Sequence, residues 1–475
     1  MSEPSEPYPL DPSAERMTEL VHEVARRTVE FLETLPAQPA YSNEGGEALA
    51  QRLAEAPPET GASLESILDL LFKEVIPCSL NTAHAGYFAY VPGGGLYSAA
   101  VAEYLAAAVN RFSGLWIAAP GAVELETQVV RWLAELLGMA PGSLGVLTTG
   151  GSMSNLLAVV AAREGLPGKD VHKATFYASE QAHFCVPRAA RVAGIPASNI
   201  RTIAVDDAFR MRVDRLAEAV AEDRDRGLVP FFVCASAGTV NTGTVDPLAD
   251  IADVARAENL WFHVDGAYGG VFRLVPELQE MFVGLDRVDS FAVDPHKGLF
   301  LPYGTGALLM REVDRLGDAF ACDAPYLPSD QVDTSRLDFC GLTPELSRDW
   351  RGLRLWLPLK LHGIAAFRGA LRQKRAMASR AFDALSAEPD FEAAAPPDLS
   401  LFAFRWKRGG SLAAENQYNQ RVLDRINAPR RVYLTPTTLR GKLFLRLCVL
   451  HLRTDESHLD DALKLIREAL AAEQP

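Results

Sequence analysis

The sequence predicts an α/β fold built on a mainly parallel sheet, because two patterns agree. Between residues 87 and 310, short apolar segments alternate with amphipathic helical segments. This alternation is typical of parallel strands whose connecting helices cover both faces of a sheet. After residue 348, a long helical segment leads into a smaller unit of mixed strands and helices. The large sheet is predicted to contain seven strands, at residues 144–149, 174–178, 200–204, 230–235, 260–264, 290–293 and 306–310.

The helical spacing of apolar residues places the other elements around this sheet. Helices between the strands are predicted at residues 124–137, 154–163, 212–225 and 247–259. The N-terminal part has a helix at 17–35, ended by Pro36, and short helices at 49–53 and 64–72. The C-terminal part has helices at 350–372, 415–426 and 456–471 and strands at 399–406 and 442–451. We therefore predict an N-terminal helical arm (1–80), a large α/β domain (81–355) and a small α+β domain (356–475).

Composition excludes several classes of protein. The 475 residues include 47 Lys+Arg and 61 Asp+Glu, a net charge of −14, which argues against binding nucleic acid. No apolar run approaches the ~18 residues that cross a membrane, and the acidic, proline-rich start does not read as a signal peptide. Six scattered cysteines without a CxxC motif predict reduced thiols and a cytoplasmic location. With no HExxH motif or Cys/His cluster, no metal site is predicted.

Unusual residues follow several predicted strands, at the edge where a parallel sheet binds its ligands. Residues 148–155 read Thr-Thr-Gly-Gly-Ser-Met-Ser-Asn and lead from a strand into a helix. Paired glycines permit a close backbone approach, and the free N–H groups of a helix start suit a phosphate. The spacing matches neither GxxxxGK[ST] nor GxGxxG, which argues against a nucleoside triphosphatase and a dinucleotide enzyme. Taken alone, an ordinary strand-to-helix turn explains this segment equally well.

Three ionisable residues follow other strands of the same sheet. Asp265 ends a buried strand, where its charge needs a partner such as a protonated ring nitrogen, and Ala267 leaves room for a flat ring. Lys297 follows another strand, where partial desolvation lowers the pKa of an amine and favours a Schiff base with an aldehyde. His183 follows a third strand. Each of these residues, taken alone, is most simply a structural one.

Together these residues match the chemistry of pyridoxal 5′-phosphate. The cofactor brings a phosphate, a pyridine nitrogen that needs a proton, an aldehyde that needs an amine, and a flat ring that needs a stacking partner. Coincidence poorly explains residues suited to all four at the strand ends of one sheet. The sequence therefore predicts that pyridoxal 5′-phosphate binds at the carboxyl edge of the large sheet.

The sequence resembles the group II pyridoxal-phosphate-dependent amino-acid decarboxylases, the family of aromatic-L-amino-acid, histidine and glutamate decarboxylases. The resemblance spans residues 81–454 and rests on ordered motifs at residues 84–90, 124–126, 151–152, 183, 238–239, 263–269 and 294–297. It implies an aspartate-aminotransferase-like fold and a homodimer with active sites at the subunit interface. It also implies a small-molecule amino-acid substrate that loses CO2 to give an amine.

The resemblance further implies roles for individual residues. Lys297 is then the Schiff-base lysine, Asp265 the partner of the pyridine nitrogen, and His183 the histidine stacked on the cofactor ring. The other implied cofactor contacts are Ser152, Met153 and Ser154 at the phosphate turn, His296 at the phosphate, Thr239 beside the ring and Ala267 against its other face. The implied substrate contacts are His84, Tyr87, Phe88 and Phe339.

The reaction and the substrate stay open at this point. Family decarboxylases carry a loop tyrosine that delivers the final proton, and counting back from Trp350 puts Phe339 at that place. In relatives resembling aldehyde synthases, a phenylalanine there lets oxygen react, which yields an aldehyde, ammonia and peroxide. This oxidative reaction is the alternative to simple decarboxylation. Tyr87 and Phe88 favour a bulky or aromatic amino acid, whereas Arg111 in the same region would suit an acidic side chain.

Overall fold

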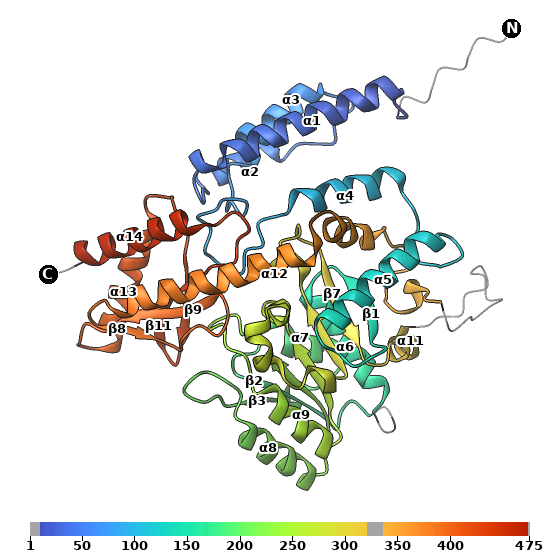
Figure 1. Cartoon of the computed structure of the whole chain (residues 1–475), viewed down its shortest axis with the longest axis vertical. Helices are drawn as coiled ribbons and strands as arrows, with labels where there is room; N and C mark the ends of the chain where they lie inside the picture. Colours follow the sequence, from blue (N-terminus) through green and yellow to red (C-terminus); the bar gives the residue numbers. More distant parts are fainter. Residues whose placement is uncertain (1–9, 167, 169, 321–335, 474–475) are drawn as a thin grey trace.

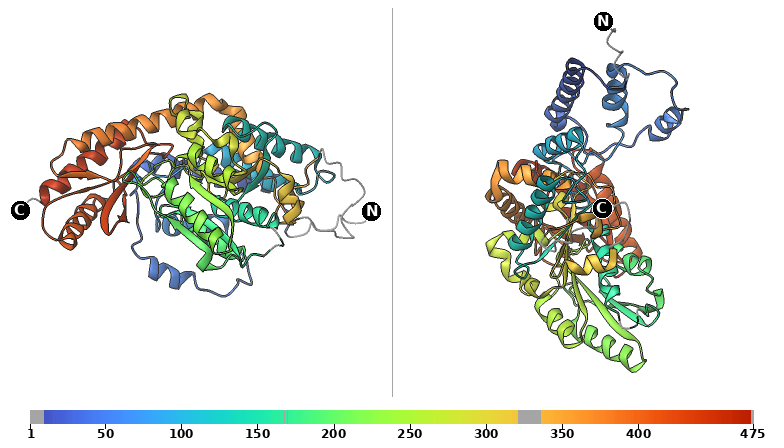
Figure 2. Two further views of the ribbon diagram at one scale, coloured as in Figure 1. Left: turned by 90° about the horizontal axis from the view of Figure 1, so that it is seen from below. Right: turned by 90° about the vertical axis from the view of Figure 1, so that its right-hand side faces the viewer.

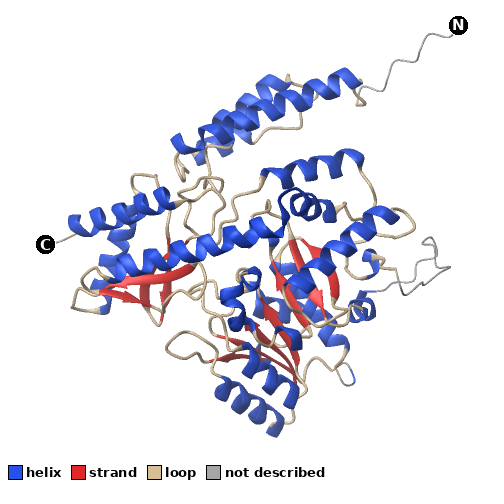
Figure 3. Cartoon of the chain, in the orientation of Figure 1, coloured by secondary structure: helices blue, strands red, loops and turns tan. Residues whose placement is uncertain are grey.

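The chain is organised around two sheets (Figure 3). The computed structural model describes residues 10–166, 168, 170–320 and 336–473. The larger sheet has seven strands in the order β1-β7-β6-β5-β4-β2-β3, which confirms the predicted strand number. Each end of these seven strands lies within one residue of its predicted position. The strands are β1 (Leu144–Thr148), β2 (Ala174–Ser179), β3 (Ile200–Ile203), β4 (Val229–Ser236), β5 (Trp261–Asp265), β6 (Ser290–Val293) and β7 (Gly306–Met310).

The large sheet is mainly parallel, as predicted. The pairs β2–β3, β2–β4, β4–β5 and β5–β6 are parallel, whereas β7 runs antiparallel to both of its neighbours, β1 and β6. The carboxyl ends of β1, β2, β4, β5 and β6 therefore meet at one edge of the sheet. The residues that precede β7 reach that same edge because this strand runs in the opposite direction.

Helices cover both faces of this sheet (Figure 1). Successive strand residues point to opposite faces, and accordingly Val146 and Leu147 belong to two different buried apolar clusters. Helices α5, α8, α9 and α12 supply one cluster, and α6, α7 and α11 supply the other. Their bounds are α5 (Pro120–Leu136), α6 (Gly151–Glu164), α7 (Cys185–Val192), α8 (Val213–Asp225), α9 (Leu248–Ala257), α11 (Asp314–Phe320) and α12 (Arg351–Ser386).

The smaller sheet lies at the C-terminal end and is antiparallel, in the order β10-β11-β9-β8. Its strands are β8 (Phe391–Ala393), β9 (Leu401–Trp406), β10 (Thr435–Leu439) and β11 (Lys442–Cys448), and helices α13 (Leu412–Asn427) and α14 (Glu456–Ala472) pack against them. The sequence did not predict the two edge strands. β8 has only three residues. β10 contains Pro436, a residue that argues against a strand in the sequence although an edge strand tolerates it.

Helix α12 connects the two parts of the molecule (Figure 2). It begins at Arg351 and continues unbroken through the predicted domain boundary at 355/356. The non-helical backbone angles of Gly363 (φ 70°, ψ 152°) kink it further along. The predicted boundary thus falls within a helix rather than in a linker.

The N-terminal helices stand apart from the rest of the chain (Figures 1 and 2). They are α1 (Ala14–Thr34), α2 (Gly46–Leu53) and α3 (Leu64–Leu70). Helix α1 contains no buried residue. Its contacts with the α3 region include the Phe31 and Phe72 rings, whose centroids lie 6.2 Å apart. Among the described residues, no helix is long and apolar enough to span a membrane.

Candidate active site

A cavity of about 420 Å³ opens at the carboxyl edge of the large sheet. It collects residues that follow β1, β2, β4, β5 and β6, and residues that precede β7. Eight of the side chains implied as cofactor contacts line it: Ser152, Met153, His183, Thr239, Asp265, Ala267, His296 and Lys297. Residues more than 140 positions apart in the chain thus meet in one place, because the carboxyl ends of parallel strands lie at the same edge of a sheet.

The turn after β1 forms the wall suited to a phosphate. Gly150 has a φ of +149°, in the region that favours glycine. A Cβ on Gly151 would lie 2.9 Å from the Cβ of Ala267 and 3.1 Å from Oδ2 of Asp294, so glycine permits the close approach of three strand ends. Helix α6 begins here, and its first N–H groups have no partner within the helix. Such N–H groups are suited to an anion.

The hydroxyls of this turn do not all face the cavity. Ser152 is exposed and lines it. Ser154 is fully buried, and its Oγ lies 2.8 Å from Oγ1 of Thr148. Ser154 is therefore a structural residue in this arrangement, which differs from the sequence-based expectation that it contacts a phosphate.

Asp265 ends β5 and is almost fully buried beside the cavity. Its Oδ2 accepts a hydrogen bond from Nδ2 of Asn155 (3.0 Å), and its Oδ1 accepts one from the backbone N–H of Ala267 (3.1 Å). These donors stabilise the ionised carboxylate at a buried position. Such a carboxylate is a suitable partner for a protonated ring nitrogen.

Lys297 lies closer to carboxylate groups than the sequence suggested. Its Nζ lies 2.9 Å from Oδ2 of the buried Asp294. Burial alone would lower the pKa of the amine, but the carboxylates of Asp294 and Asp265 raise it above its ordinary value. The expected lowering of this pKa is therefore wrong for the free lysine, because the sequence pattern gave no sign of the Asp294 contact.

Two histidines complete the cavity. His183 has a lowered pKa because burial outweighs the attraction of Asp265, and its Nδ1 lies 2.8 Å from Sγ of Cys185. His296 also has a pKa lowered by burial, and its Nδ1 donates to the carbonyl of Thr305 (2.7 Å). That bond fixes the hydrogen of neutral His296 on Nδ1 and leaves Nε2 without a hydrogen.

Thr239 follows β4 and belongs to a buried group of hydroxyls. Its Oγ1 lies 2.6 Å from Oγ1 of Thr242 and 3.2 Å from that of Thr244. Gly238, directly before it, has a φ of +97° and approaches the ring of Tyr268. This segment holds Thr239 at the wall of the cavity.

The four implied substrate contacts are not among the residues that line the cavity. His84 accepts the backbone N–H of Gly86 on its Nδ1 (3.0 Å), and the Tyr87 ring lies 5.7 Å from that of Tyr433. Phe88 is fully buried in the core of the C-terminal unit. Tyr87 and Phe88 thus contact the small C-terminal unit, where the sequence had suggested a substrate wall.

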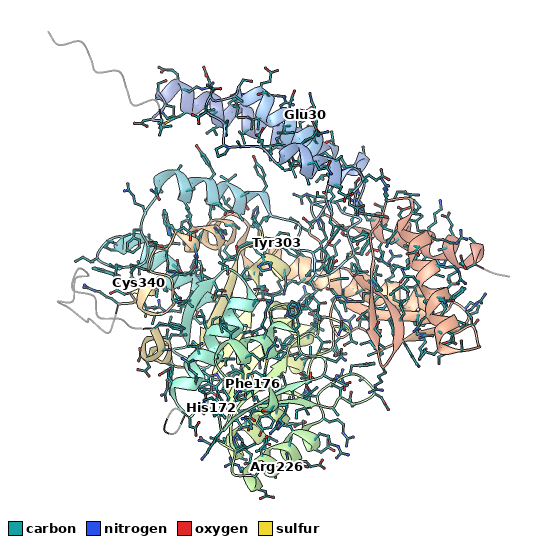
Figure 4. The ribbon with its side chains drawn as sticks, turned by 180° about the vertical axis from the view of Figure 1, so that it is seen from behind. Glu30, His172, Phe176, Arg226, Tyr303 and Cys340 are labelled. Carbon is teal, nitrogen blue, oxygen red and sulfur yellow. The ribbon has the colours of Figure 1, made fainter. Side chains whose placement is uncertain are left out.

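Phe339 is likewise absent from the cavity wall. It has no exposed surface and packs in the apolar cluster under α6 and α11. The guanidinium carbon of Arg348 lies 4.7 Å from the centre of its ring. In Figure 4, the neighbouring Cys340 lies well away from Tyr303 of the cavity wall. Phe339 thus lies in the core of its own chain, and the implied contact with substrate stays a prediction.

Sequence reasoning missed several residues that do line the cavity. Tyr90 and Tyr303 add aromatic surface, and Asp294 and Asn155 add polar groups. Tyr303 lies before β7, and its ring centre is 5.6 Å from that of His296 (Figure 4). Asp294 stood two residues before a singled-out histidine, so its charge was visible in the sequence. Tyr90 and Asn155 stood at the ends of the motifs at residues 84–90 and 148–155 without being assigned a role, and Tyr303 lay outside every motif.

Comparisons with known proteins identify the family. A family model described as the pyridoxal-dependent decarboxylase conserved domain matches residues 47–407. The chain is 33% identical to an aromatic-L-amino-acid decarboxylase of Bacillus atrophaeus, over 98% of this chain and 97% of that protein. It therefore belongs to the pyridoxal-dependent decarboxylase family, and it is a pyridoxal-phosphate-dependent carboxy-lyase.

Solved structures confirm the fold. The crystal structure of Oryza sativa TDC with PLP and tryptamine superposes with a TM-score of 0.94 at 28% identity, covering 98% of this chain and 100% of that one. A 4-hydroxyphenylacetaldehyde synthase of Rhodiola rosea superposes with a TM-score of 0.90 at 26% identity, over 98% and 99%. The predicted large mainly parallel sheet and small C-terminal unit are thus those of a pyridoxal phosphate enzyme.

The described residues fit this cofactor. One cavity holds a primary amine, a buried carboxylate, a helix start suited to phosphate, and an imidazole and a small alanine for the two faces of a ring. Oδ1 of Asp294 is a buried oxygen without a partner among the described residues. It remains available to accept a hydrogen bond from a bound molecule, because a buried polar atom is rarely left unpaired.

Proposed function

We propose that this chain decarboxylates an aromatic L-amino acid to the corresponding amine. The observation that carries this proposal is the cavity in which Lys297, Asp265, His183 and the α6 start converge beside aromatic side chains. When bound, pyridoxal phosphate supplies an electron sink for the electrons left on the substrate carbon as CO2 departs. The protein supplies the binding, the orientation and the protons.

Individual residues take the following parts in this proposal. Lys297 provides the amine that bonds the cofactor aldehyde, and Asp265 holds a proton on the pyridine nitrogen by its negative charge. His183 and Ala267 cover the two ring faces. Ser152, Met153 and the first N–H groups of α6 hold the phosphate, and His296 joins them when its Nε2 takes up a proton. Thr239 contacts a ring substituent. Ser154 acts indirectly, through its contact with Thr148.

The aromatic preference is supported by the composition of the cavity wall. Tyr90 and Tyr303 line it, and its described lining residues include no arginine. An acidic substrate side chain would need such a cation beyond the lysine and the histidines already engaged, and Arg111 lies outside the lining. The similarity to an aromatic-L-amino-acid decarboxylase agrees with this preference.

We propose that the active form is a homodimer. A single chain leaves apolar side chains exposed on α1 and on α4 (Tyr97–Val109). The exposed residues are Met17, Val21, Val24 and Val29 on α1, and Tyr97, Val101, Tyr104 and Leu105 on α4. Exposed apolar side chains grouped on two helices are typical of a subunit interface, and a second copy of the chain would cover them. Sedimentation equilibrium tests this: a monomer at micromolar concentration contradicts it.

A cytoplasmic location is the last part of the proposal. The five described cysteines, Cys78, Cys185, Cys234, Cys340 and Cys448, are all free thiols, which suits a reducing compartment. Cys322 lies outside the described residues.

An oxidative reaction on the same site is the second candidate, favoured by the close superposition with the 4-hydroxyphenylacetaldehyde synthase. Product analysis separates the two. Purified enzyme is given a panel of amino acids while CO2, amine, aldehyde and dissolved oxygen are measured. CO2 with an equal amount of amine and no oxygen uptake supports decarboxylation. Aldehyde with oxygen uptake supports the second candidate. Turnover of glutamate but of no aromatic amino acid contradicts the proposed aromatic substrate, whichever reaction takes place.

Lys297→Ala tests the assignment of the site itself. We expect loss of the visible absorption band of the lysine-bound cofactor and loss of CO2 release. Lys464→Ala is a matched control, because Lys464 is a solvent-exposed lysine on α14. An unchanged absorption band in Lys297→Ala would contradict the proposed role of this lysine.

A further inference from the structure

A buried chain of hydrogen bonds runs through the middle of the large sheet and ends at Asp265. Trp261 Nε1 donates to Oγ of Ser290 (2.8 Å), and the same Oγ lies 2.8 Å from Nδ1 of His263. Nε2 of His263 lies 2.7 Å from Oδ1 of Asn155, whose Nδ2 lies 3.0 Å from Oδ2 of Asp265. Ser290, His263 and Asn155 are essentially inaccessible to solvent. Every link is within normal hydrogen-bond distance.

The chain has a direction, because the indole nitrogen at one end is only a donor and the Asp265 carboxylate at the other end is an acceptor of the Asn155 N–H. Ser290 Oγ accepts from Trp261, so its single hydrogen is free to be donated to Nδ1 of His263. His263 then carries its hydrogen on Nε2 and donates it to Oδ1 of Asn155. Burial supports this neutral form, since it lowers the pKa of His263 to about 4. The amide nitrogen of Asn155 is thereby turned toward Asp265.

The same amide also reaches His183 through a second branch. Nδ2 of Asn155 lies 3.2 Å from Sγ of Cys185, and that sulfur lies 2.8 Å from Nδ1 of His183. Burial raises the pKa of the Cys185 thiol to about 11, so the sulfur keeps its hydrogen and donates it to Nδ1. His183 then carries its own hydrogen on Nε2. Asn155 is therefore the branch point between the two groups proposed to contact the cofactor ring.

The reversed arrangement is unfavourable at two places. If the Asn155 amide turned over, its oxygen would face the Asp265 carboxylate, and one of the two groups would need an extra proton. At the other end, the fully buried Ser290 hydroxyl would lose the acceptor for its hydrogen. Leaving a buried polar group unpaired is unfavourable. The observed direction avoids both penalties.

We propose that Asn155 is a positioning residue and that Trp261, at the far end of the chain of hydrogen bonds, helps to set the orientation of its amide. This orientation keeps Asp265 an anionic acceptor and keeps the hydrogen of His183 on Nε2. The proposal rests on the proposed roles of Asp265 and His183. Its consequence is that a side chain with no place at the cavity, Trp261, affects the affinity for the cofactor. Trp261 instead lines a separate groove at the opposite edge of the sheet.

The first test reads the direction of the chain without measuring activity. Holoenzyme with ¹⁵N-labelled histidine is examined by NMR, and the His263 signal is assigned by its disappearance in His263→Gln. We expect wild-type His263 to be neutral with its hydrogen on Nε2, and Trp261→Phe to produce a mixture with the Nδ1–H form. A wild-type His263 that is charged, or that carries its hydrogen on Nδ1, overturns the proposal.

The second test measures cofactor retention by diluting the holoenzyme and following the visible absorption. We expect Trp261→Phe and Asn155→Asp to weaken binding by about tenfold or more, the fold-change equivalent to one lost polar contact. Trp406→Phe is the matched control, because Trp406 is a buried tryptophan whose Nε1 has no partner among the described residues. If Asn155→Asp does not fold, Ser290→Ala interrupts the same chain and takes its place.

Asp265→Asn separates this proposal from the assigned role of Asp265. Weak binding in Asp265→Asn together with wild-type binding in Trp261→Phe and Asn155→Asp overturns the positioning role alone. Wild-type binding in Asp265→Asn overturns the role of Asp265 and, with it, the proposal. Weakened binding in all three, with Trp406→Phe unchanged, supports both.

Discussion

Replacing Phe339 with tyrosine tests whether this ring decides between amine and aldehyde as the product. The sequence placed Phe339 where related decarboxylases carry a proton-donating tyrosine. In the structure its ring has no exposed surface and lies beneath the guanidinium of Arg348, inside an apolar cluster away from the cavity. A hydroxyl added to this ring would enter the core rather than the active site. We therefore expect Phe339→Tyr to leave the ratio of amine to aldehyde unchanged.

The same substitution should lower stability by an amount that follows from its surroundings. Adding an atom to a close-packed core costs about 1–3 kcal/mol, and an unpaired buried hydroxyl costs a similar amount. Nε and Nη1 of Arg348 have no partner among the described residues and are available as donors, which offsets part of the second cost. The expected net loss in the free energy of unfolding is about 2 kcal/mol.

The assay combines product analysis under air with a denaturant unfolding curve. Phe282→Tyr is the matched control, because Phe282 is another fully buried phenylalanine in the other apolar cluster. Both variants should lose stability and keep the wild-type products. A shift of Phe339→Tyr from aldehyde to amine, absent from Phe282→Tyr, would refute the reasoning, since it would mean that this ring reaches a reacting group.

Three other variants test the site and its support. Tyr303→Phe removes a hydroxyl from the cavity wall and tests whether this hydroxyl donates the proton that completes the reaction. We expect kcat to fall by roughly a hundredfold with cofactor absorption unchanged, and an unchanged kcat contradicts that role. Arg348→Met leaves the Glu126 carboxylate buried without its 2.7 Å partner, so the unfolding free energy should fall by about 3–5 kcal/mol and partly recover when Glu126→Gln is added. Lys374 is buried, which lowers its pKa to about 8. Between pH 8 and the ordinary lysine pKa of about 10.5, the unfolded chain holds a proton that the folded chain has lost. The free energy of unfolding should therefore rise across this pH range, by about 3 kcal/mol in all. Lys374→Met should lack this rise in unfolding curves measured at pH 7.5 and 10, and an equal rise in both proteins would exclude this lysine as its source.

The features predicted correctly from the sequence are those that a local pattern determines. Apolar strands followed by Asp265, Lys297 or a Gly-Gly turn are visible within a few residues, and the parallel topology brings their ends to one edge. The orientation of Ser154 also has a local explanation. Successive helical residues are turned by about 100°, so Ser152 and Ser154 point in widely separated directions and only one of them faces the cavity.

The features that the sequence could not provide depend on neighbours distant in the chain. The raised pKa of Lys297 comes from the carboxylates of Asp294 and Asp265, whose distances only the folded chain defines. Asn155 read as an ordinary helix residue, because its partners His263 and Asp265 lie more than 100 positions away. The contacts of Tyr87 and Phe88 with the small C-terminal unit were hidden for a similar reason, since their partners are distant in the chain.

The direction of β7 explains why Tyr303 escaped prediction. In a parallel sheet, functional residues are sought after each strand, and the residues after β7 lie at the far edge. Because β7 is antiparallel to β1 and β6, the segment before it reaches the active-site edge instead. That segment supplies both Tyr303 and the Thr305 carbonyl that accepts the Nδ1 hydrogen of His296. One reversed strand thus adds a hydroxyl to the cavity and determines which nitrogen of His296 stays free to accept or bind a proton.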